Sequence, residues 1–214
     1  MASRRVHHDG APATSQERRG GVPEPGEGGT ARTPTTLREV VDRLPDLPRF
    51  RVEIINGRVI VSPRSTPRQS WTIALLVEAF LPLARERGWR TWPELDVCIS
   101  WTREPLIPDF AMGPADAPRR GEREILSDGL ILVAEVVSAG SVREDREDKP
   151  LLYARGRVPF LLVVDAEADP RTVVLYGDPG DDGYRTVTTV KMGELLRLPD
   201  PIGLTLDTSI FLDA

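Results

Sequence analysis

The sequence predicts one α/β (α+β) domain in which helices flank a mixed β-sheet. Along the chain, the apolar patterns follow the order helix, hairpin, helix, several strands, helix and further strands, without an internal repeat. The runs LILVAEVV (130–137) and PFLLVVDA (159–166) are almost continuously apolar rather than alternating. Such runs are typical of central strands that are covered on both faces. A length of 214 residues suits one domain with a tail.

The first 34 residues differ in composition from the rest. They are rich in Gly, Pro, Ser, Thr and charged residues, so we expect a disordered tail over 1–34 and a folded domain over 35–214. Both histidines, His7 and His8, fall in this tail. Chemistry in the folded domain must therefore use carboxylates, lysine, hydroxyls and the backbone. This disfavours histidine-based nucleases, serine triads and histidine-ligated zinc.

Local signals place the first elements of the domain. The apolar spacing over 35–44 predicts a short helix that is capped by one of its first two threonines, Thr35 or Thr36. The segment RFRVEIINGRVIVS (49–62) predicts an N-terminal hairpin, because Asn56-Gly57 between two apolar runs is a strong turn signal.

A longer helix follows this hairpin. The apolar spacing predicts it over Ser70–Arg87, with Gly88 as its C-cap and Pro82 as a point where it can kink.

The patterns in the second half of the chain predict mainly strands. A helix is expected over 150–155, and residues 171–190 have the pattern of a C-terminal hairpin. The other strands are expected within the segments 92–101, 106–112, 130–137, 159–166 and 203–214.

Composition excludes several classes of protein. A net charge of −5 argues against general nucleic-acid coating through a basic surface, but not against a local basic groove. No apolar run is long enough for a membrane span, and no secretory signal is visible, so we expect a cytoplasmic protein without membrane contact. The single cysteine, Cys98, excludes an internal disulfide and a cysteine zinc cluster. The absence of a Gly-rich phosphate loop predicts no nucleotide cofactor.

Two carboxylates stand out in strand-like segments. Glu135 lies inside the apolar run 130–137, where a charge is costly unless it is paired or bound to a metal. Asp109 lies in LIPDFAM, and adjacent strands would bring the two side chains together. Oxygen ligands without histidine or cysteine suit Mg²⁺ or Mn²⁺, and the backbone carbonyl of Val136 is a further candidate ligand.

Lys149 is the candidate cationic member of the site. It is one of only two lysines among 28 basic residues. Asp145, Lys149 and Tyr153 are spaced by four and would share a face if all were helical. Because Pro150 disfavours helical geometry in the residue before it, we expect Lys149 at the mouth of the helix.

These residues also have ordinary structural explanations. An Asp after Pro is often a turn or cap residue, Glu53 fits an exposed strand position, and Tyr153 fits packing. The run REDREDK (143–149) is typical of a solvated surface. The hairpin region is basic, which favours either phosphate contact or simple solubility. Its arginines are Arg49, Arg51, Arg58, Arg64 and Arg68.

The ordered set of motifs resembles a known family. E…ING…SP, then IPDF, then VAEVVS…D…KPLLYA…VPF…VVD is similar to the Uma-type family of restriction endonucleases, members of the PD-(D/E)XK nuclease superfamily. The resemblance covers residues 48–214. It implies a restriction-endonuclease-like core and hydrolysis of DNA that leaves a 5′-phosphate and a 3′-hydroxyl.

The resemblance also assigns roles. Asp109 and Glu135 would be metal ligands for Mg²⁺ or Mn²⁺, Lys149 would be the superfamily lysine moved to the following helix, and Glu53 would complete the catalytic set. This chain has Gln69 where the family often has a histidine.

Two functional hypotheses follow. The first is a metal-dependent DNA endonuclease, as a homodimer, because two cuts in a duplex suit two-fold symmetry. Arg64, Arg68 and Gln69 are its candidate DNA-contacting residues, and Asp145 and Tyr153 its supporting residues. The second is a nuclease-fold binding module without turnover, which the loss of the histidine and the acidic net charge favour.

Overall fold

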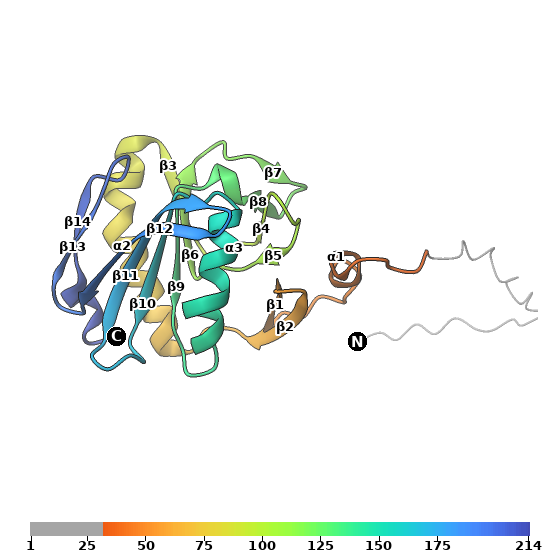
Figure 1. Cartoon of the computed structure of the whole chain (residues 1–214), viewed down its shortest axis with the longest axis horizontal. Helices are drawn as coiled ribbons and strands as arrows, with labels where there is room; N and C mark the ends of the chain where they lie inside the picture. The colour runs from red at the N-terminus through yellow and green to blue at the C-terminus, as the bar shows by residue number, and fades with distance from the viewer. Residues whose placement is uncertain (1–31) are drawn as a thin grey trace, which may run out of the picture. The chain divides into compact units, whose positions relative to one another are not determined.

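A six-stranded mixed sheet forms the centre of the computed structural model, which describes residues 32–214 (Figure 1). The predicted tail over 1–34 lies almost entirely outside the described residues. The strand order is β12, β11, β10, β9, β6, β3. β9 and β10 are parallel, and every other neighbouring pair is antiparallel. The bounds are β3 (Trp89–Pro93), β6 (Phe110–Pro114), β9 (Leu132–Val136), β10 (Phe160–Asp165), β11 (Thr172–Gly180) and β12 (Gly183–Lys191).

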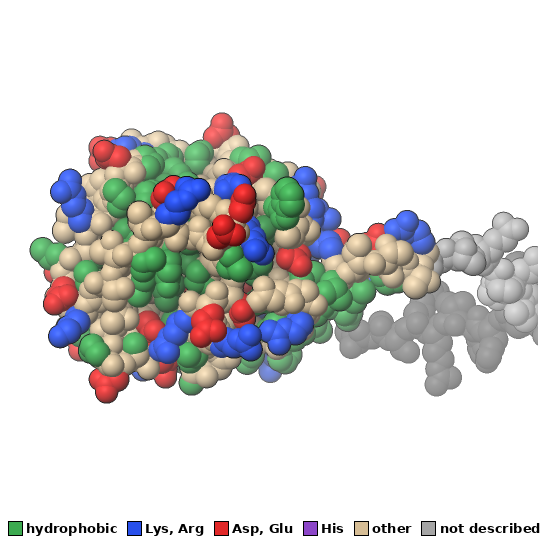
Figure 2. Space-filling view, in the orientation of Figure 1, with side chains coloured by type: hydrophobic (Ala, Val, Ile, Leu, Met, Phe, Trp, Pro, Cys, Tyr) green, Lys and Arg blue, Asp and Glu red, His purple; other side chains and the backbone are tan. Residues whose placement is uncertain are grey.

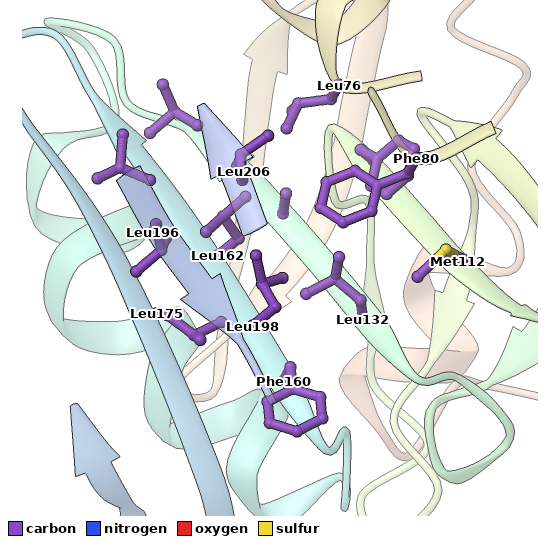
Figure 3. Packing of buried hydrophobic residues seen from close by; sticks show 14 of the residues in the cluster. Leu76, Phe80, Met112, Leu132, Phe160, Leu162, Leu175, Leu196, Leu198 and Leu206 are labelled. Atoms are coloured by element: carbon purple, nitrogen blue, oxygen red, sulfur yellow. The ribbon is translucent and has the colours of Figure 1, made fainter. Parts of the chain in front are cut away.

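Helices cover both faces of the central strands, as the apolar runs predict. α2 (Pro67–Arg87) packs on one face, where its Leu76 and Phe80 join Leu132 and Leu162 in an apolar cluster (Figure 3). α3 (Lys149–Arg155) lies on the other face, where Leu152 and Tyr153 join a second cluster. The α/β (α+β) class with a mixed sheet is therefore confirmed.

Smaller elements surround this sheet. They are α1 (Leu37–Val41), the hairpin of β1 (Phe50–Ile55) and β2 (Arg58–Pro63), a small sheet of β5 (Pro105–Leu106), β4 (Val97–Cys98), β8 (Glu124–Leu126) and β7 (Arg119–Arg120), and the pair β13 (Leu195–Leu198) and β14 (Leu204–Asp207). The 3-10 helices are Ser127–Gly129 and Thr208–Phe211, and Glu144–Asp148 forms a π-helix. No helix within residues 32–214 has the length and hydropathy needed to span a membrane.

The N-terminal hairpin turns at Asn56-Gly57, as predicted. Both residues have positive φ, 49° and 69°, which is the geometry that Asn-Gly adopts readily in a two-residue turn. The turn fixes the register of β1, so that Arg51, Glu53 and Ile55 share one face, and all three are buried.

The long helix begins earlier than Ser70. Thr66 is its N-cap, and the Thr66 hydroxyl accepts from the Gln69 N–H while the Gln69 side chain accepts from the Thr66 N–H. This reciprocal capping box and Pro67 in the first turn fix the start, so the predicted start was wrong. The predicted end is confirmed, because Gly88 follows the helix with a φ of 69°.

The predicted short helix and C-terminal hairpin are present. Thr36 caps α1, although the helix ends at Val41 rather than reaching residue 44. β11 and β12 form the predicted C-terminal hairpin and one edge of the central sheet.

Candidate active site

Glu135 projects from β9 toward α3. Along β9, Leu132, Ala134 and Val136 belong to the α2-side cluster, whereas Val133 packs on the α3 side. Because side chains alternate along a strand, Glu135 shares the α3 side with Val133. It is 1% exposed. A fully buried carboxylate requires partners.

Both carboxylate oxygens of Glu135 are paired. The Lys149 Nζ lies 3.0 Å from its Oε2, and the Tyr153 hydroxyl donates to its Oε1 at 2.6 Å. Both partners come from α3, one helical turn apart. The helix therefore fixes the orientation of the carboxylate.

The segment before α3 sets the position of the lysine. Glu144–Asp148 is a π-helix, and Lys149 follows with helical angles of φ −65° and ψ −37°. Lys149 is the first residue of α3, so its expected place at the mouth of the helix is confirmed, although its backbone is helical despite Pro150. Pro150 sits in the first turn of α3, where its missing N–H is not needed. The Asp145 Oδ1 lies 3.0 Å from the Lys149 Nζ, so the predicted common face exists.

Glu53 reaches the same lysine from the N-terminal hairpin. Its Oε1 lies 3.5 Å from the Lys149 Nζ and accepts from the Ile107 N–H at 2.9 Å. Glu53 is 4% exposed, so it is not the exposed strand residue that the sequence also allowed. Three carboxylates thus surround one buried ammonium.

Asp109 precedes β6 and is oriented by the backbone of β9. The Val136 N–H donates to its Oδ2 at 2.7 Å. Its Oδ1 lies 2.7 Å from the Arg51 Nη1, yet has no partner in hydrogen-bond geometry. Asp109 is 2% exposed. One of its oxygens is therefore fixed by the backbone, and the other is in ionic contact only.

The ionisable side chains described above, except Tyr153, line one pocket of about 360 Å³. Its ionisable members with buried side chains are Arg51, Glu53, Asp109, Glu135, Asp145 and Lys149. Small residues form a further part of the wall, namely Ser62, Ser65, Ser138, Gly140 and Ser141. The pocket therefore combines a charged floor with room for a ligand.

The buried charges do not balance. Four carboxylates face two cations, so the pocket has a formal excess of two negative charges. Burial raises the pKa of the Glu135 carboxyl well above its ordinary value, and the nearby acids add to this effect while Lys149 opposes it. Burial also raises the pKa of Asp109, against the influence of Arg51. The site therefore favours the entry of a positive charge.

Lys149 and Tyr153 keep their protons in this environment. Burial acts to lower the pKa of Lys149, but Glu135, Glu53 and Asp145 together raise it well above its ordinary value. Burial and the Glu135 charge raise the pKa of the Tyr153 hydroxyl. Both groups therefore act as hydrogen-bond donors rather than bases.

The donor set fits a hard divalent cation in chemistry and charge. Carboxylate oxygens are the ligands that Mg²⁺ and Mn²⁺ prefer. Asp109 Oδ1 is a buried oxygen without a hydrogen bond, as is Asp145 Oδ1. Among residues 32–214, no group of three or more His, Cys, Asp or Glu side chains is already arranged around one point. A divalent cation would therefore bind Asp109 and Glu135 together only if their ion pairs opened.

Comparison with protein families identifies the chain. The family model for Uma2, described as "Putative restriction endonuclease", matches residues 38–209. The chain belongs to the Uma2 family. The resemblance found in the sequence is thus confirmed, and the Uma2 match includes all the pocket residues described above.

A solved structure shows that the Uma2 fold of this chain is shared. A crystal structure from Anabaena variabilis ATCC 29413, described as a putative nuclease belonging to DUF820, superposes with a TM-score of 0.65. Its sequence is 20% identical, and the match covers 84% of this chain and 98% of the other. At this identity the likeness establishes the restriction-endonuclease-like fold alone. A search of curated proteins finds no match.

Two of the three predicted DNA-contacting residues of this Uma2 protein lie at the pocket, and the third lies outside it. Arg64 and Gln69 line the pocket. The Gln69 side-chain oxygen is already engaged by the Thr66 N–H. Arg68 is exposed and donates from Nε to the Ala214 carbonyl at 2.6 Å, outside this pocket.

Sequence reasoning missed Arg51. It was grouped with the surface arginines of the hairpin, yet it is 7% exposed and contacts both Asp109 and Glu94. The two-residue period of a strand was an available signal, because it places Arg51 on the same face as Glu53. The partner Glu94 had no such signal.

The run 143–149 of the Uma2 protein is only partly solvated. Glu147 is exposed, as expected. Asp148 is 8% exposed and accepts from the Asn56 Nδ2 at 2.6 Å, so its assignment to the solvated surface was wrong. This contact ties the hairpin turn to the segment that carries Lys149.

Proposed function

We propose that this Uma2 protein is a metal-dependent endonuclease that hydrolyses DNA phosphodiester bonds. The observation that carries the proposal is the pocket in which four buried carboxylates face only two buried cations. A divalent cation neutralises this excess, and a phosphodiester is a substrate that such a cation activates by polarising a phosphoryl oxygen. The family description of restriction endonuclease supports the same reaction.

Asp109 and Glu135 are the proposed ligands of Mg²⁺ or Mn²⁺, with the Val136 carbonyl as a third. These residues occupy neighbouring, antiparallel strands or their ends, and all three line the pocket. An ion held there supplies Lewis-acid polarisation of the phosphate and lowers the pKa of an attacking water.

Lys149 has the role of a cation that faces the reacting phosphate. Because its pKa is raised, it stays protonated and balances negative charge that develops on the phosphate oxygens. Glu53 and Asp145 hold its ammonium in place. Tyr153 positions Glu135 through a hydrogen bond and touches no reacting atom.

DNA reaches the pocket through a local basic rim in this proposal. Arg64 lies on the pocket wall and is half-exposed, which suits contact with a backbone phosphate. Acidic and basic side chains alternate on the face shown in Figure 2, without a broad basic surface. Recognition of DNA in this proposal therefore depends on the pocket and its rim. The proposed location of the protein is the cytoplasm.

A homodimer is part of the proposal. Half of the exposed large apolar side chains of residues 32–214 lie in the segment 37–61, and a second copy of the chain would cover them. They are Leu37, Val40, Leu44, Phe50 and Val61. Light scattering of wild type and a Leu37→Ser/Val40→Ser variant tests this. A monomeric wild type contradicts it.

A binding module without turnover is the second candidate. Gln69 stands at the position of the family histidine, and its side chain accepts a hydrogen bond from the Thr66 N–H that caps α2. Calorimetry separates a binding module with no working site from an enzyme, because such a module shows no Mn²⁺ binding that depends on Asp109 and Glu135.

Plasmid nicking tests the proposed reaction. Purified protein is incubated with supercoiled DNA and Mg²⁺ or Mn²⁺, and Glu135→Gln is compared with Glu147→Gln, which removes an exposed acid from a nearby segment. We expect nicking by wild type and Glu147→Gln but not by Glu135→Gln. Nicking that survives Glu135→Gln, or no nicking of any DNA substrate, contradicts the proposal.

A further inference from the structure

Arg51 is a buried cation held between two acids. Its side chain is 8% exposed, with the Nη1 at 2.7 Å from the Asp109 Oδ1 and the Nη2 at 2.6 Å from the Glu94 Oε1. Burial lowers the pKa of a guanidinium, but Asp109 and Glu94 raise that of Arg51 above its ordinary value. Arg51 therefore remains charged at any physiological pH.

The two acids hold Arg51 in different ways. On the Asp109 side, the contact lacks hydrogen-bond geometry, and both the Arg51 Nε and the Asp109 Oδ1 have no hydrogen-bond partner. On the other side, the Nη2 donates to Glu94 and to the Ser65 hydroxyl, which itself donates to the Glu94 Oε1 at 2.7 Å. The guanidinium is therefore anchored on Glu94 and only in ionic contact with Asp109.

Asp109 does not need Arg51 for its orientation. The Val136 N–H fixes the Oδ2 of Asp109 at 2.7 Å. The backbone therefore holds the carboxylate through Oδ2, whereas Arg51 contacts the buried Oδ1. Any second cation in the pocket competes with Arg51 for this one atom.

We propose that Arg51 is the counter-cation of the metal-free site, which a divalent ion displaces from Asp109 and which then remains on Glu94 and Ser65. Arg51 thereby sets the metal concentration at which the site fills, while it keeps Asp109 compensated when the ion is absent. This inference rests on the proposed metal-dependent function and assigns the residue that regulates its site.

Mn²⁺ calorimetry of four variants tests the inference without an activity measurement. Removing the competitor in Arg51→Gln is expected to tighten Mn²⁺ binding by about tenfold. Arg58→Gln is the matched control, because Arg58 is an exposed arginine of the same hairpin that does not line the pocket, and we expect a change below about twofold. Ser65→Ala keeps the charge but weakens the anchor beside Glu94, so Mn²⁺ binding is expected to weaken. Asp109→Asn is expected to abolish it.

The outcomes separate this inference from the proposed function. If wild type binds Mn²⁺ through Asp109 but Arg51→Gln binds equally or more weakly, Arg51 is not a competitor and the inference fails while the metal site stands. If Ser65→Ala binds more tightly or equally, the anchor has been misassigned. If neither the wild type nor any variant binds Mn²⁺, both the inference and the metal site are wrong. If Arg51→Gln unfolds without metal, Ser65→Ala and a crystal structure of the wild type with Mn²⁺ test the inference instead. In that crystal structure, the contact between the Arg51 Nη1 and the Asp109 Oδ1 must be open.

Discussion

The two faces of β9 differ in the polarity of their surroundings. On the α2 side, Leu132, Ala134 and Val136 pack into a wholly apolar cluster. On the α3 side, Glu135 interrupts an otherwise apolar surface and is surrounded by further ionisable groups. One face contributes stability through apolar burial, whereas the other keeps a charge that costs stability unless it is compensated. Five consecutive residues thus serve both the fold and the site.

The largest expected effect comes from removing the charge on the α3 side. Glu135→Gln keeps the shape of the side chain but removes a proposed ligand, so we expect Mg²⁺-dependent cleavage to fall by about 10³-fold. Urea unfolding of the same variant should show lower stability at pH 7, because an amide offers one oxygen to the two donors, Lys149 and Tyr153, that the carboxylate pairs. Unchanged cleavage would mean that the charge serves the fold alone.

The converse change on the α2 side should affect stability alone. Leu132→Ala removes a fully buried side chain and is expected to cost about 3 kcal/mol of unfolding free energy. Urea unfolding measures it, with Val187→Ala at an exposed position of β12 as the control, expected to change stability by less than about 0.5 kcal/mol. Cleavage per folded molecule should remain that of wild type. A loss of cleavage per folded molecule would contradict the proposal that the α2 side of β9 serves stability alone.

The pH dependence of stability sharpens the comparison. Because the pKa of Glu135 is higher in the folded protein than its ordinary 4.5, the folded state binds the extra proton, and this stabilisation is lost as pH rises through the folded pKa. We expect the stability of Glu135→Gln relative to wild type to increase with pH above 4.5, by at most about 1.4 kcal/mol per pH unit. Metal-free urea unfolding from pH 5 to 8 measures this. A constant difference contradicts the raised pKa.

The smallest expected effect is at Tyr153. Tyr153→Phe removes the hydrogen bond to Glu135 and should slow cleavage about tenfold, with a stability loss of about 1 kcal/mol. Tyr184→Phe is the matched control, because its hydroxyl donates to the Val158 carbonyl at 2.8 Å away from the pocket. Equal effects of the two changes on cleavage would show that Tyr153 has no positioning role.

Local signals in the sequence predict the elements that local geometry determines. Asn56-Gly57 and Gly88 need positive φ, and the structure has both. Thr66 and Gln69 have the pattern of a capping box, which marks the start of α2. The predicted start at Ser70 was based on the apolar spacing, which begins later than the capping box. Glu135 was conspicuous because a charge in a central strand is rare.

The composition of the pocket depends on tertiary contacts that no local pattern contains. Asp109 was a candidate from its strand-like segment and from the family resemblance, but it follows a proline in an ordinary setting, and nothing local predicted its contact with Arg51. Arg51 is buried because the hairpin packs beside Glu94, a residue more than 40 positions away. The burial of Asp148 likewise depends on Asn56. Long-range pairs of this kind decide which of many similar charges are buried.

Isothermal titration calorimetry with Mn²⁺ tests the central claim most directly, that the buried carboxylates form a divalent-cation site. Wild type, Asp109→Asn, Glu135→Gln and the exposed control Glu147→Gln are titrated in the absence of DNA. The account predicts saturable binding to wild type and Glu147→Gln that is lost in Asp109→Asn and Glu135→Gln. Absent binding, or binding that persists without both carboxylates, would contradict it.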